Sequence, residues 1–256
     1  MDAGGGGAAA TLTDARSLAA AADRAGTATS STAAIIADLR SAATAIPDRG
    51  VYGTKTPAKD RVLAAVAAAE ALVASEAAAA AALPGSPCVS AATGAWAPTA
   101  ALPALAGSWT VLWSTVTCTG SRRVKLGLKT AVSLKGVAQA ISQGEGGGGG
   151  ASHPSPITGT ATNTVSFSLL FMGGAVGALT LEAAYETLSP TRVGIRLTRA
   201  ALAPPALDAL FGPARLPLLL EIFNPEGWLD TTFVGGGLRV GRDDKGHVFV
   251  LERVGE

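Results

Sequence analysis

Apolar and polar side chains alternate along most of the chain beyond residue 107, with the period of a β-strand. Seven short segments place an apolar residue at every second position, as a half-buried antiparallel strand requires. They cover residues 108–115, 165–171, 179–186, 193–198, 228–234, 238–242 and 247–253. Glycine-containing turns at 235–237 and 243–246 separate the last three segments. The pattern therefore predicts at least seven antiparallel strands.

A meander of so many short strands closes most economically into a barrel, because closure removes exposed strand edges. A barrel of about eight strands leaves room for one small ligand. Two sheets packed face to face are the alternative architecture. Residues 144–156, which are rich in glycine, are expected to form a flexible loop between two strands.

Upstream of the strands, the apolar period changes to that of a helix. Residues 31–46 carry apolar side chains at helical spacing, and Pro47 stops the pattern. A second helix is expected to start at Thr56, with Pro57 where its missing N–H costs nothing, and to continue towards Leu83. Both helices are rich in alanine, which buries little area, so we expect them to pack on a larger body.

Together these patterns predict a mainly β protein of the α+β class, in which two amphipathic helices precede an antiparallel barrel. The expected parts are a flexible segment at 1–30, a helical extension at 31–83, a proline-rich linker at 84–106 and the barrel at 107–256.

Charge is unevenly distributed along the 256 residues, although the formal net charge of +1 argues against nucleic-acid binding. No Asp or Glu lies between Ala77 and Gly144, while Arg122, Arg123 and Lys125 cluster in that stretch. This basic segment is suited to a diphosphate headgroup, an anionic lipid surface or an acidic patch on a partner protein. A solvated basic loop is the alternative.

The sequence gives little support for catalysis. His153 lies in a Gly/Pro-rich loop and His247 in a hairpin, so neither has the setting of a metal-ligand pair or a catalytic base. Cys88 and Cys118 lack the spacing of a zinc site, and no glycine tract is followed by Lys-Ser or Lys-Thr. We therefore predict a non-enzymatic protein that needs no metal or cofactor and works in a reducing compartment.

Neither a membrane span nor a targeting segment is evident in the pattern. The longest apolar run is mainly alanine, which is too short and too weakly hydrophobic to cross a bilayer. The amino-terminal residues include several aspartates, which do not fit a transit peptide.

Six blocks of sequence resemble the plastid lipid-associated proteins, the fibrillins. They are Arg49-Gly50-Val51-Tyr52-Gly53, Gly107-Ser108-Trp109, residues 112–115 (LWST), residues 120–128 (GSRRVKLGL), residues 221–230 (EIFNPEGWLD) and residues 238–253 (LRVGRDDKGHVFVLER). In this order they look closest to the fifth fibrillin subgroup. The resemblance implies a lipocalin-like barrel that works among plastid prenyl-lipids, in the chloroplast stroma or at thylakoids and plastoglobules. It also implies association with a solanesyl diphosphate synthase and a role in plastoquinone biosynthesis.

Aromatic side chains are the candidate walls of an apolar ligand cavity, and the alternative is that they only fill the barrel. They are Trp109, Trp113, Phe167, Phe171 and Phe233. For Trp109, the resemblance implies a ring that plugs one end of the barrel. An arginine on a late strand, Arg239 or else Arg242, is expected to stack on this ring by a cation–π contact. Gly107 and Arg239 would then have structural roles.

Three functional hypotheses follow from these observations. The first is an accessory protein that binds a long-chain prenyl diphosphate synthase and accepts its hydrophobic product. The second is a lipid-binding protein of plastoglobules or thylakoids, which predicts a ligand-sized cavity or an exposed apolar face. The third is an enzyme that acts on a bound lipid, which predicts convergent polar groups inside the barrel.

Overall fold

The computed structural model of the chain describes residues 31–81, 105–117, 132–144, 158–169, 173–189, 191–207 and 226–255. In these segments eight antiparallel strands pair in sequence order, and the last strand pairs back with the first, so that the sheet forms a closed barrel. The strands are β1 (Gly107–Ser114), β2 (Val132–Gln143), β3 (Thr158–Leu169), β4 (Ala175–Thr187), β5 (Arg192–Ala203), β6 (Gly227–Gly235), β7 (Leu238–Asp243) and β8 (Val248–Arg253). The predicted class, mainly β with helices at the amino-terminal side, is confirmed.

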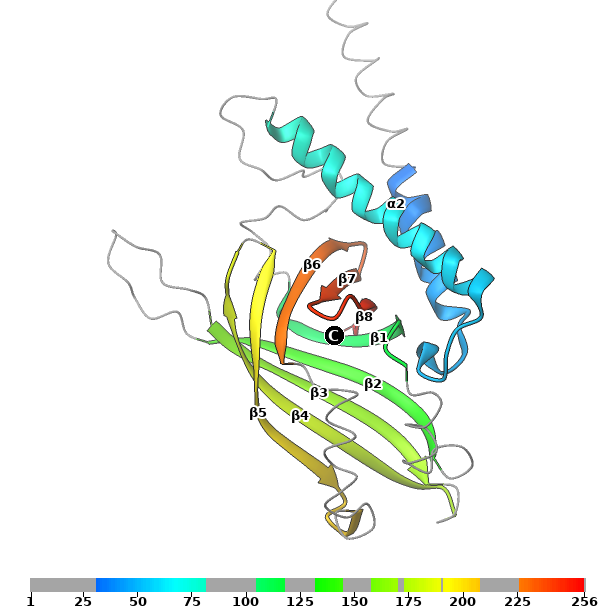
Figure 1. The fold of residues 1–256 in the computed structure, drawn as a ribbon, viewed down its shortest axis with the longest axis vertical. Helices are drawn as coiled ribbons and strands as arrows, with labels where there is room; N and C mark the ends of the chain where they lie inside the picture. The colour runs from blue at the N-terminus through cyan, green and yellow to red at the C-terminus, as the bar shows by residue number, and fades with distance from the viewer. Residues whose placement is uncertain are drawn as a thin grey trace, which may run out of the picture.

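The barrel has two unlike sides (Figure 1). The strands β2 to β5 are long, with 12 or 13 residues each, and form one extended wall. The strands β7 and β8 have only 6 residues each, and β6 and β1 are also short. The helices lie beside these short strands on the outside of the barrel, so the short side of the barrel is the side that is covered.

Strand β2 is the element that the sequence pattern missed. Its pairing with β3 shifts between Leu134 and Gly136, which leaves Lys135 as an extra residue in the ladder. Such a bulge moves the following apolar positions to the other parity. In addition, the polar Gln139 occupies an inward position of this strand. Alternation is therefore interrupted twice within a segment of 12 residues.

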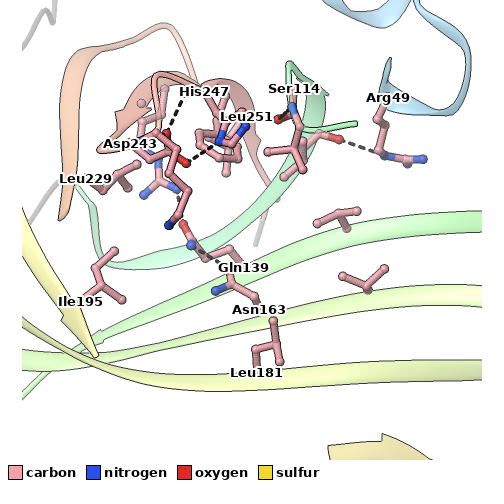
Figure 2. Close-up of a pocket in the computed structure, with 18 of the residues that line it drawn as sticks. Arg49, Ser114, Gln139, Asn163, Leu181, Ile195, Leu229, Asp243, His247 and Leu251 are labelled. Carbon is pink, nitrogen blue, oxygen red and sulfur yellow. Dashed lines mark hydrogen bonds and ion pairs between the residues drawn. The ribbon is translucent and has the colours of Figure 1, made fainter. Parts of the chain in front are cut away.

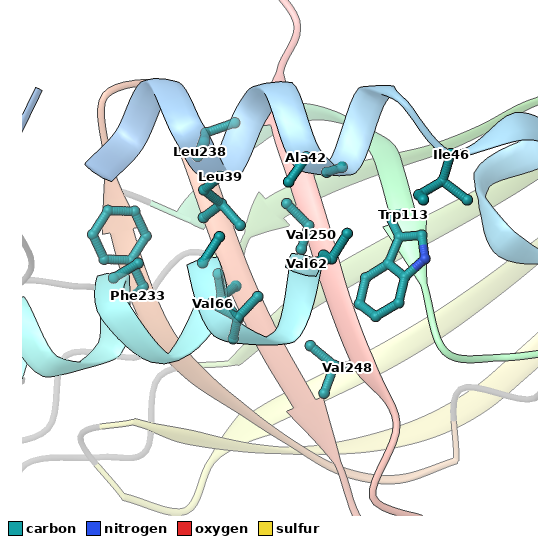
Figure 3. Close-up of a cluster of buried hydrophobic side chains, with 14 residues drawn as sticks. Leu39, Ala42, Ile46, Val62, Val66, Trp113, Phe233, Leu238, Val248 and Val250 are labelled. Atoms are coloured by element: carbon teal, nitrogen blue, oxygen red, sulfur yellow. The ribbon is translucent and has the colours of Figure 1, made fainter. Parts of the chain in front are cut away.

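The amino-terminal part contains a helix over residues 31–44, the short 3-10 helix η1 (Pro47–Gly50) and the long helix α2 (Thr56–Ala81). Both predicted helices are present, and both pack on the barrel as expected. Figure 3 shows their buried side chains meeting those of the short strands. The amino-terminal part contributes Leu39, Ala42, Ala43, Ile46, Val62, Ala65, Val66 and Ala69 to this cluster, and the barrel contributes Trp113, Phe233, Leu238, Val240, Val248 and Val250.

A bulge in β1 decides which tryptophan faces the helices. Val111 lies opposite Leu251 in β8, but Trp113 lies opposite Val250, so Leu112 is an extra residue. Strict alternation predicted that Trp109, Val111 and Trp113 share one face, and this prediction is wrong for Trp113. The bulge turns its side chain out of the barrel and into the helix cluster.

A second bulge does the same for Phe233. Thr231 lies opposite Gly241 and Phe233 opposite Val240, which leaves Thr232 unpaired in β6. Phe233 is consequently buried against the helices and is 0% exposed. The two bulges give the short strands a second apolar face, and the helices need this face for packing.

The turn around η1 explains the Arg-Gly-x-x-Gly block of the sequence. Arg49 adopts a φ of 55°, a conformation that is uncommon for a residue with a side chain. Gly50, with a φ of 81°, passes so close to β1 that a Cβ atom would lie 2.7 Å from the Ser114 carbonyl oxygen. The turn is fixed from both sides, because Arg49 Nε donates to the Val111 carbonyl oxygen at 2.9 Å and Trp113 Nε1 donates to Thr54 Oγ1 at 3.1 Å.

Candidate functional site: a cavity inside the barrel

A cavity of about 160 Å³ lies inside the barrel. Its apolar wall is formed by aliphatic side chains and one phenyl ring. These are Val51, Val111, Val116, Val137, Val165, Leu181, Ile195, Leu229, Phe249 and Leu251. Polar groups enter the lining at separate places, and Figure 2 shows Gln139 and Asn163 at the long strands and Asp243 with His247 at the short ones. The cavity is therefore an apolar space with a few localised polar groups.

The aromatic residues that were predicted as cavity walls lie elsewhere. Trp113 and Phe233 face the helices because of the two bulges. Phe167 is buried in a cluster with Leu169 and Leu179 and does not reach the cavity surface. Phe171 lies outside the described residues. Among the described residues, the aromatic lining comes instead from Trp228, His247 and Phe249.

Trp109 is buried next to the cavity rather than in its lining. Its side chain is 0% exposed and packs with Val111 and Leu251. Its indole Nε1 donates to the Leu105 carbonyl oxygen at 2.9 Å, so the polar atom of the ring is satisfied. The ring thereby fills the part of the barrel next to the start of β1.

Two arginines stack on the Trp109 ring. The Cζ atom of Arg239 lies 4.7 Å from the ring centroid, which confirms the predicted cation–π contact, and that of Arg253 lies 4.3 Å away. Arg253 also donates from Nη1 to the Ala106 carbonyl oxygen at 2.8 Å. A glycine at position 107 leaves room for the Arg253 guanidinium, because a Cβ atom there would lie 2.7 Å from Arg253 Nη1.

The other candidate of that prediction, Arg242, has a different partner. It points out of the barrel and forms two hydrogen bonds with the Glu70 carboxylate of α2, at 2.8 and 2.9 Å. Burial alone would raise the pKa of Glu70, but the hydrogen bonds from Arg242 hold this pKa below its usual value. The pair ties the long helix to β7.

A chain of polar side chains crosses the interior from β7 to β3. Arg239 Nη2 donates to Gln139 Oε1, and Gln139 Nε2 donates to Asn163 Oδ1 at 2.7 Å. Arg239 is only 2% exposed, and its Nε atom has no hydrogen-bond partner. Burial and the nearby charge of Arg253 lower the pKa of Arg239 to about 9, so the guanidinium is still a cation at neutral pH.

The pair formed by Asp243 and His247 stabilises the β7–β8 turn. Asp243 Oδ1 accepts the backbone N–H groups of Lys245 and His247, and its Oδ2 lies 2.8 Å from His247 Nδ1. This is the arrangement of a side-chain-stabilised turn, as the sequence predicted for residues 243–246. Across the described residues no group of three His, Cys, Asp or Glu side chains is placed to hold a metal ion.

The basic segment of Arg122, Arg123 and Lys125 lies outside the described residues, so its proposed role as an interaction surface stays a prediction. Gln139 and Asn163 are the site residues that pattern analysis missed. Their signal was present, since each is a polar residue at an inward position of its strand. This signal can be recognised only once the register of β2 is known.

The fold and the cavity define a small β-barrel protein with a mainly apolar internal cavity. The chain belongs to the plastid lipid-associated protein family PAP_fibrillin, whose family model matches residues 43–252. Members of this family are associated with plastids and are generally non-enzymatic. No curated protein matches this chain. None of the helices in the described segments is long and apolar enough to cross a membrane.

Proposed function

We propose that this protein is a non-enzymatic plastid lipid-associated protein that holds the end of a prenyl-lipid or another apolar molecule inside its barrel. The observation that carries the proposal is the apolar wall of the cavity, into which a few polar side chains reach at separate places, among them the buried Arg239 and its partner Gln139. Such a combination of apolar surface and few polar groups is typical of small-molecule sites.

The size of the cavity limits what can enter. Its volume of about 160 Å³ is close to that of an engineered protein cavity of about 150 Å³ that binds benzene. Pockets that enclose a drug-sized ligand measure about 300–1,000 Å³. The barrel therefore takes one ring or a short branched chain, and the remainder of a long prenyl-lipid has to extend beyond it. Glu226, Trp228 and Lys245 line the cavity near the loops.

A cavity-filling substitution tests this function. Gly241 faces the cavity, and a Cβ atom there would meet Leu229 Cδ1 at 3.4 Å, an ordinary contact, so Gly241→Leu adds its side chain to the lining without backbone strain. Gly136→Leu is the matched control, since a Cβ atom at Gly136 has no neighbour within 4 Å. We expect Gly241→Leu to abolish binding of a one-isoprene prenylquinone in isothermal titration calorimetry and Gly136→Leu to retain it. Equal affinity in all three proteins would place the quinone outside the cavity and refute the proposal.

The resemblance to the fifth fibrillin subgroup supports a second proposal, that the protein is an accessory subunit of a solanesyl diphosphate synthase in plastoquinone biosynthesis. The basic segment of Arg122, Arg123 and Lys125 is the proposed contact surface, and the prenyl product is the proposed guest of the barrel. The test is co-elution of the full chain with a plastid synthase, with turnover and product length followed in the same fractions. Charge reversal at the three basic residues should break the complex. Absence of a complex would leave a general role at plastoglobules or thylakoids.

A further inference from the structure

Arg239 is a buried cation without a counter-charge among the described residues. Its side chain enters the cavity lining from β7, is 2% exposed, and forms no ion pair with the described carboxylates. The carboxylate of Asp243 lies on the same face of β7 but four residues further along, which is about 13 Å in an extended strand, and it is engaged by His247. A buried charge is costly unless it is paired.

The guanidinium also has donors left for a ligand. Arginine carries five N–H donors, and one hydrogen bond of Arg239 to a described residue is present, from Nη2 to Gln139. The Nε atom is buried and has no partner. The Trp109 ring covers one face of the guanidinium, so the open donors lie along its edge. A planar edge of N–H donors matches the two oxygens of a carboxylate.

The structural roles of Arg239 do not account for a cation at this position. Arg253 already stacks on Trp109 and closes the barrel end through its bond to Ala106, and it does so from an exposed position. A second positive charge inside the cavity adds repulsion with Arg253. An apolar side chain would fill the same space at lower cost.

We propose that Arg239 binds the carboxylate of an apolar acid, so that the preferred guest of the barrel is an isoprenoid or acyl carboxylic acid rather than a neutral lipid. The inference rests on the proposed function, because it assigns the headgroup of the molecule that the cavity holds. The apolar wall accommodates the first carbons of the chain, and the carboxylate supplies the counter-charge that Arg239 lacks. A phosphate monoester is a poorer fit, because it carries about −1.5 to −2 charge at pH 7, which is more than the single guanidinium neutralises.

The experiment compares three probes with the same ten-carbon chain: geranic acid, geraniol and geranyl monophosphate. Affinities for the full chain are measured by titration calorimetry at pH 7.5 for the wild-type protein and for Arg239→Met, Arg239→Lys and Arg253→Met. Arg253→Met removes a charge from the same tryptophan ring outside the cavity lining and is the matched control. Arg239→Lys keeps the positive charge but removes the planar edge of donors. It also tests the role of the guanidinium if the methionine variant does not fold.

In the wild-type protein we expect geranic acid to bind about tenfold to a hundredfold more tightly than geraniol. This preference should vanish in Arg239→Met, shrink in Arg239→Lys and persist in Arg253→Met. Equal affinity for acid and alcohol in the wild-type protein would overturn the inference and leave the proposed function standing. Tighter binding of the monophosphate, lost with Arg239, would overturn the choice of carboxylate. Binding of none of the three probes would overturn the proposed function and the inference with it.

Discussion

Replacement of Arg239 by methionine should make the unliganded protein more stable. The prediction runs against the usual effect of mutating a fully buried residue, which is destabilisation. It follows from the same observations as the binding proposal, namely burial of the charge, the unpartnered Nε atom and the absence of an ion pair with any described carboxylate. A residue that binds a ligand but lowers the stability of the unliganded protein is expected to show this behaviour.

The magnitude can be estimated from the structure. Burial and the Arg253 charge lower the pKa of Arg239 from 12.5 to about 9, which corresponds to a destabilisation on the order of 5 kcal/mol at neutral pH. The methionine variant loses the cation–π contact with Trp109, about 1–2 kcal/mol. It also leaves Gln139 Oε1 without its donor, which costs about 1–3 kcal/mol. The expected net gain is about 0–3 kcal/mol, which overlaps the range found when buried charges are replaced by apolar residues.

Urea denaturation at two pH values provides the assay. The folded-state pKa of Arg239 lies below the unfolded-state pKa, so the penalty is present in full below about pH 9 and is relieved as the pH rises towards 12.5. The stability advantage of Arg239→Met should therefore shrink by about 2 kcal/mol between pH 7.5 and pH 10.5. Because the comparison is between two proteins at each pH, titration of other groups cancels to a first approximation.

Arg253→Met is the control for this experiment as well. Its guanidinium is exposed and bonded to Ala106, so its removal loses that contact but relieves the repulsion with Arg239, and its alkaline trend should be much smaller than that of Arg239→Met, because burial is the larger cause of the lowered Arg239 pKa. The reasoning is refuted if Arg239→Met is less stable than the wild-type protein at pH 7.5. It is refuted equally if the difference between the two proteins does not change with pH.

Two further predictions concern the contact between helices and barrel. Phe233→Ala should lower the free energy of unfolding by about 3–5 kcal/mol, because the ring is 0% exposed in the helix cluster. The control Val176→Ala, at a side chain that is 66% exposed, should change this free energy by less than about 0.5 kcal/mol. Equal effects of the two substitutions in urea denaturation would contradict the bulge in β6. Glu70→Gln should cost about 1 kcal/mol or less at pH 7, since the carboxylate and Arg242 are partly exposed. The folded-state pKa of Glu70 is depressed, so this difference should begin to shrink as the pH falls below the usual glutamate pKa of about 4.3, and a difference that is unchanged at pH 3 would argue against the ion pair.

Pattern analysis predicted those elements whose periodicity is uninterrupted. The helix ending before Pro47, the helix starting at Thr56 and the hairpin turn at residues 243–246 are all present in the structure. Each depends on local chemistry, such as a missing N–H group or an aspartate that bonds its own turn. Such signals lie within a few residues of their consequence and can therefore be found in a single sequence.

Two β-bulges explain why the orientations of two aromatic side chains were predicted incorrectly. One extra residue in β1 reverses the orientation of Trp113, and one in β6 reverses that of Phe233. The need for both bulges comes from helices that lie far away in sequence and require an apolar surface on the outside of the barrel. An alternation rule applied to one strand contains no information about a second layer, so it assigned both rings to the interior.

Of the contacts that Arg239 makes in the site, the one with Trp109 was predicted and the one with Gln139 was missed. Stacking of Arg239 on Trp109 followed from the resemblance to barrels that close in this way, and the structure contains it. The hydrogen bond from Arg239 to Gln139 joins residues one hundred positions apart and depends on the register of all intervening strands. The sequence around either residue contains no pattern that predicts this contact.

The segment that follows the first helix contributes directly to the wall of the cavity. Arg49 and Val51, which follow the first helix, line the cavity together with strand residues. Arg49 holds its place by donating to the Val111 carbonyl oxygen, directly before the bulge that turns Trp113 towards the helices. A strained φ of 55° at Arg49 is retained because this contact connects the wall of the cavity to the helix layer. A barrel cut out at residue 107 would therefore lose part of its cavity wall as well as its cover, and ligand binding has to be measured on the full chain.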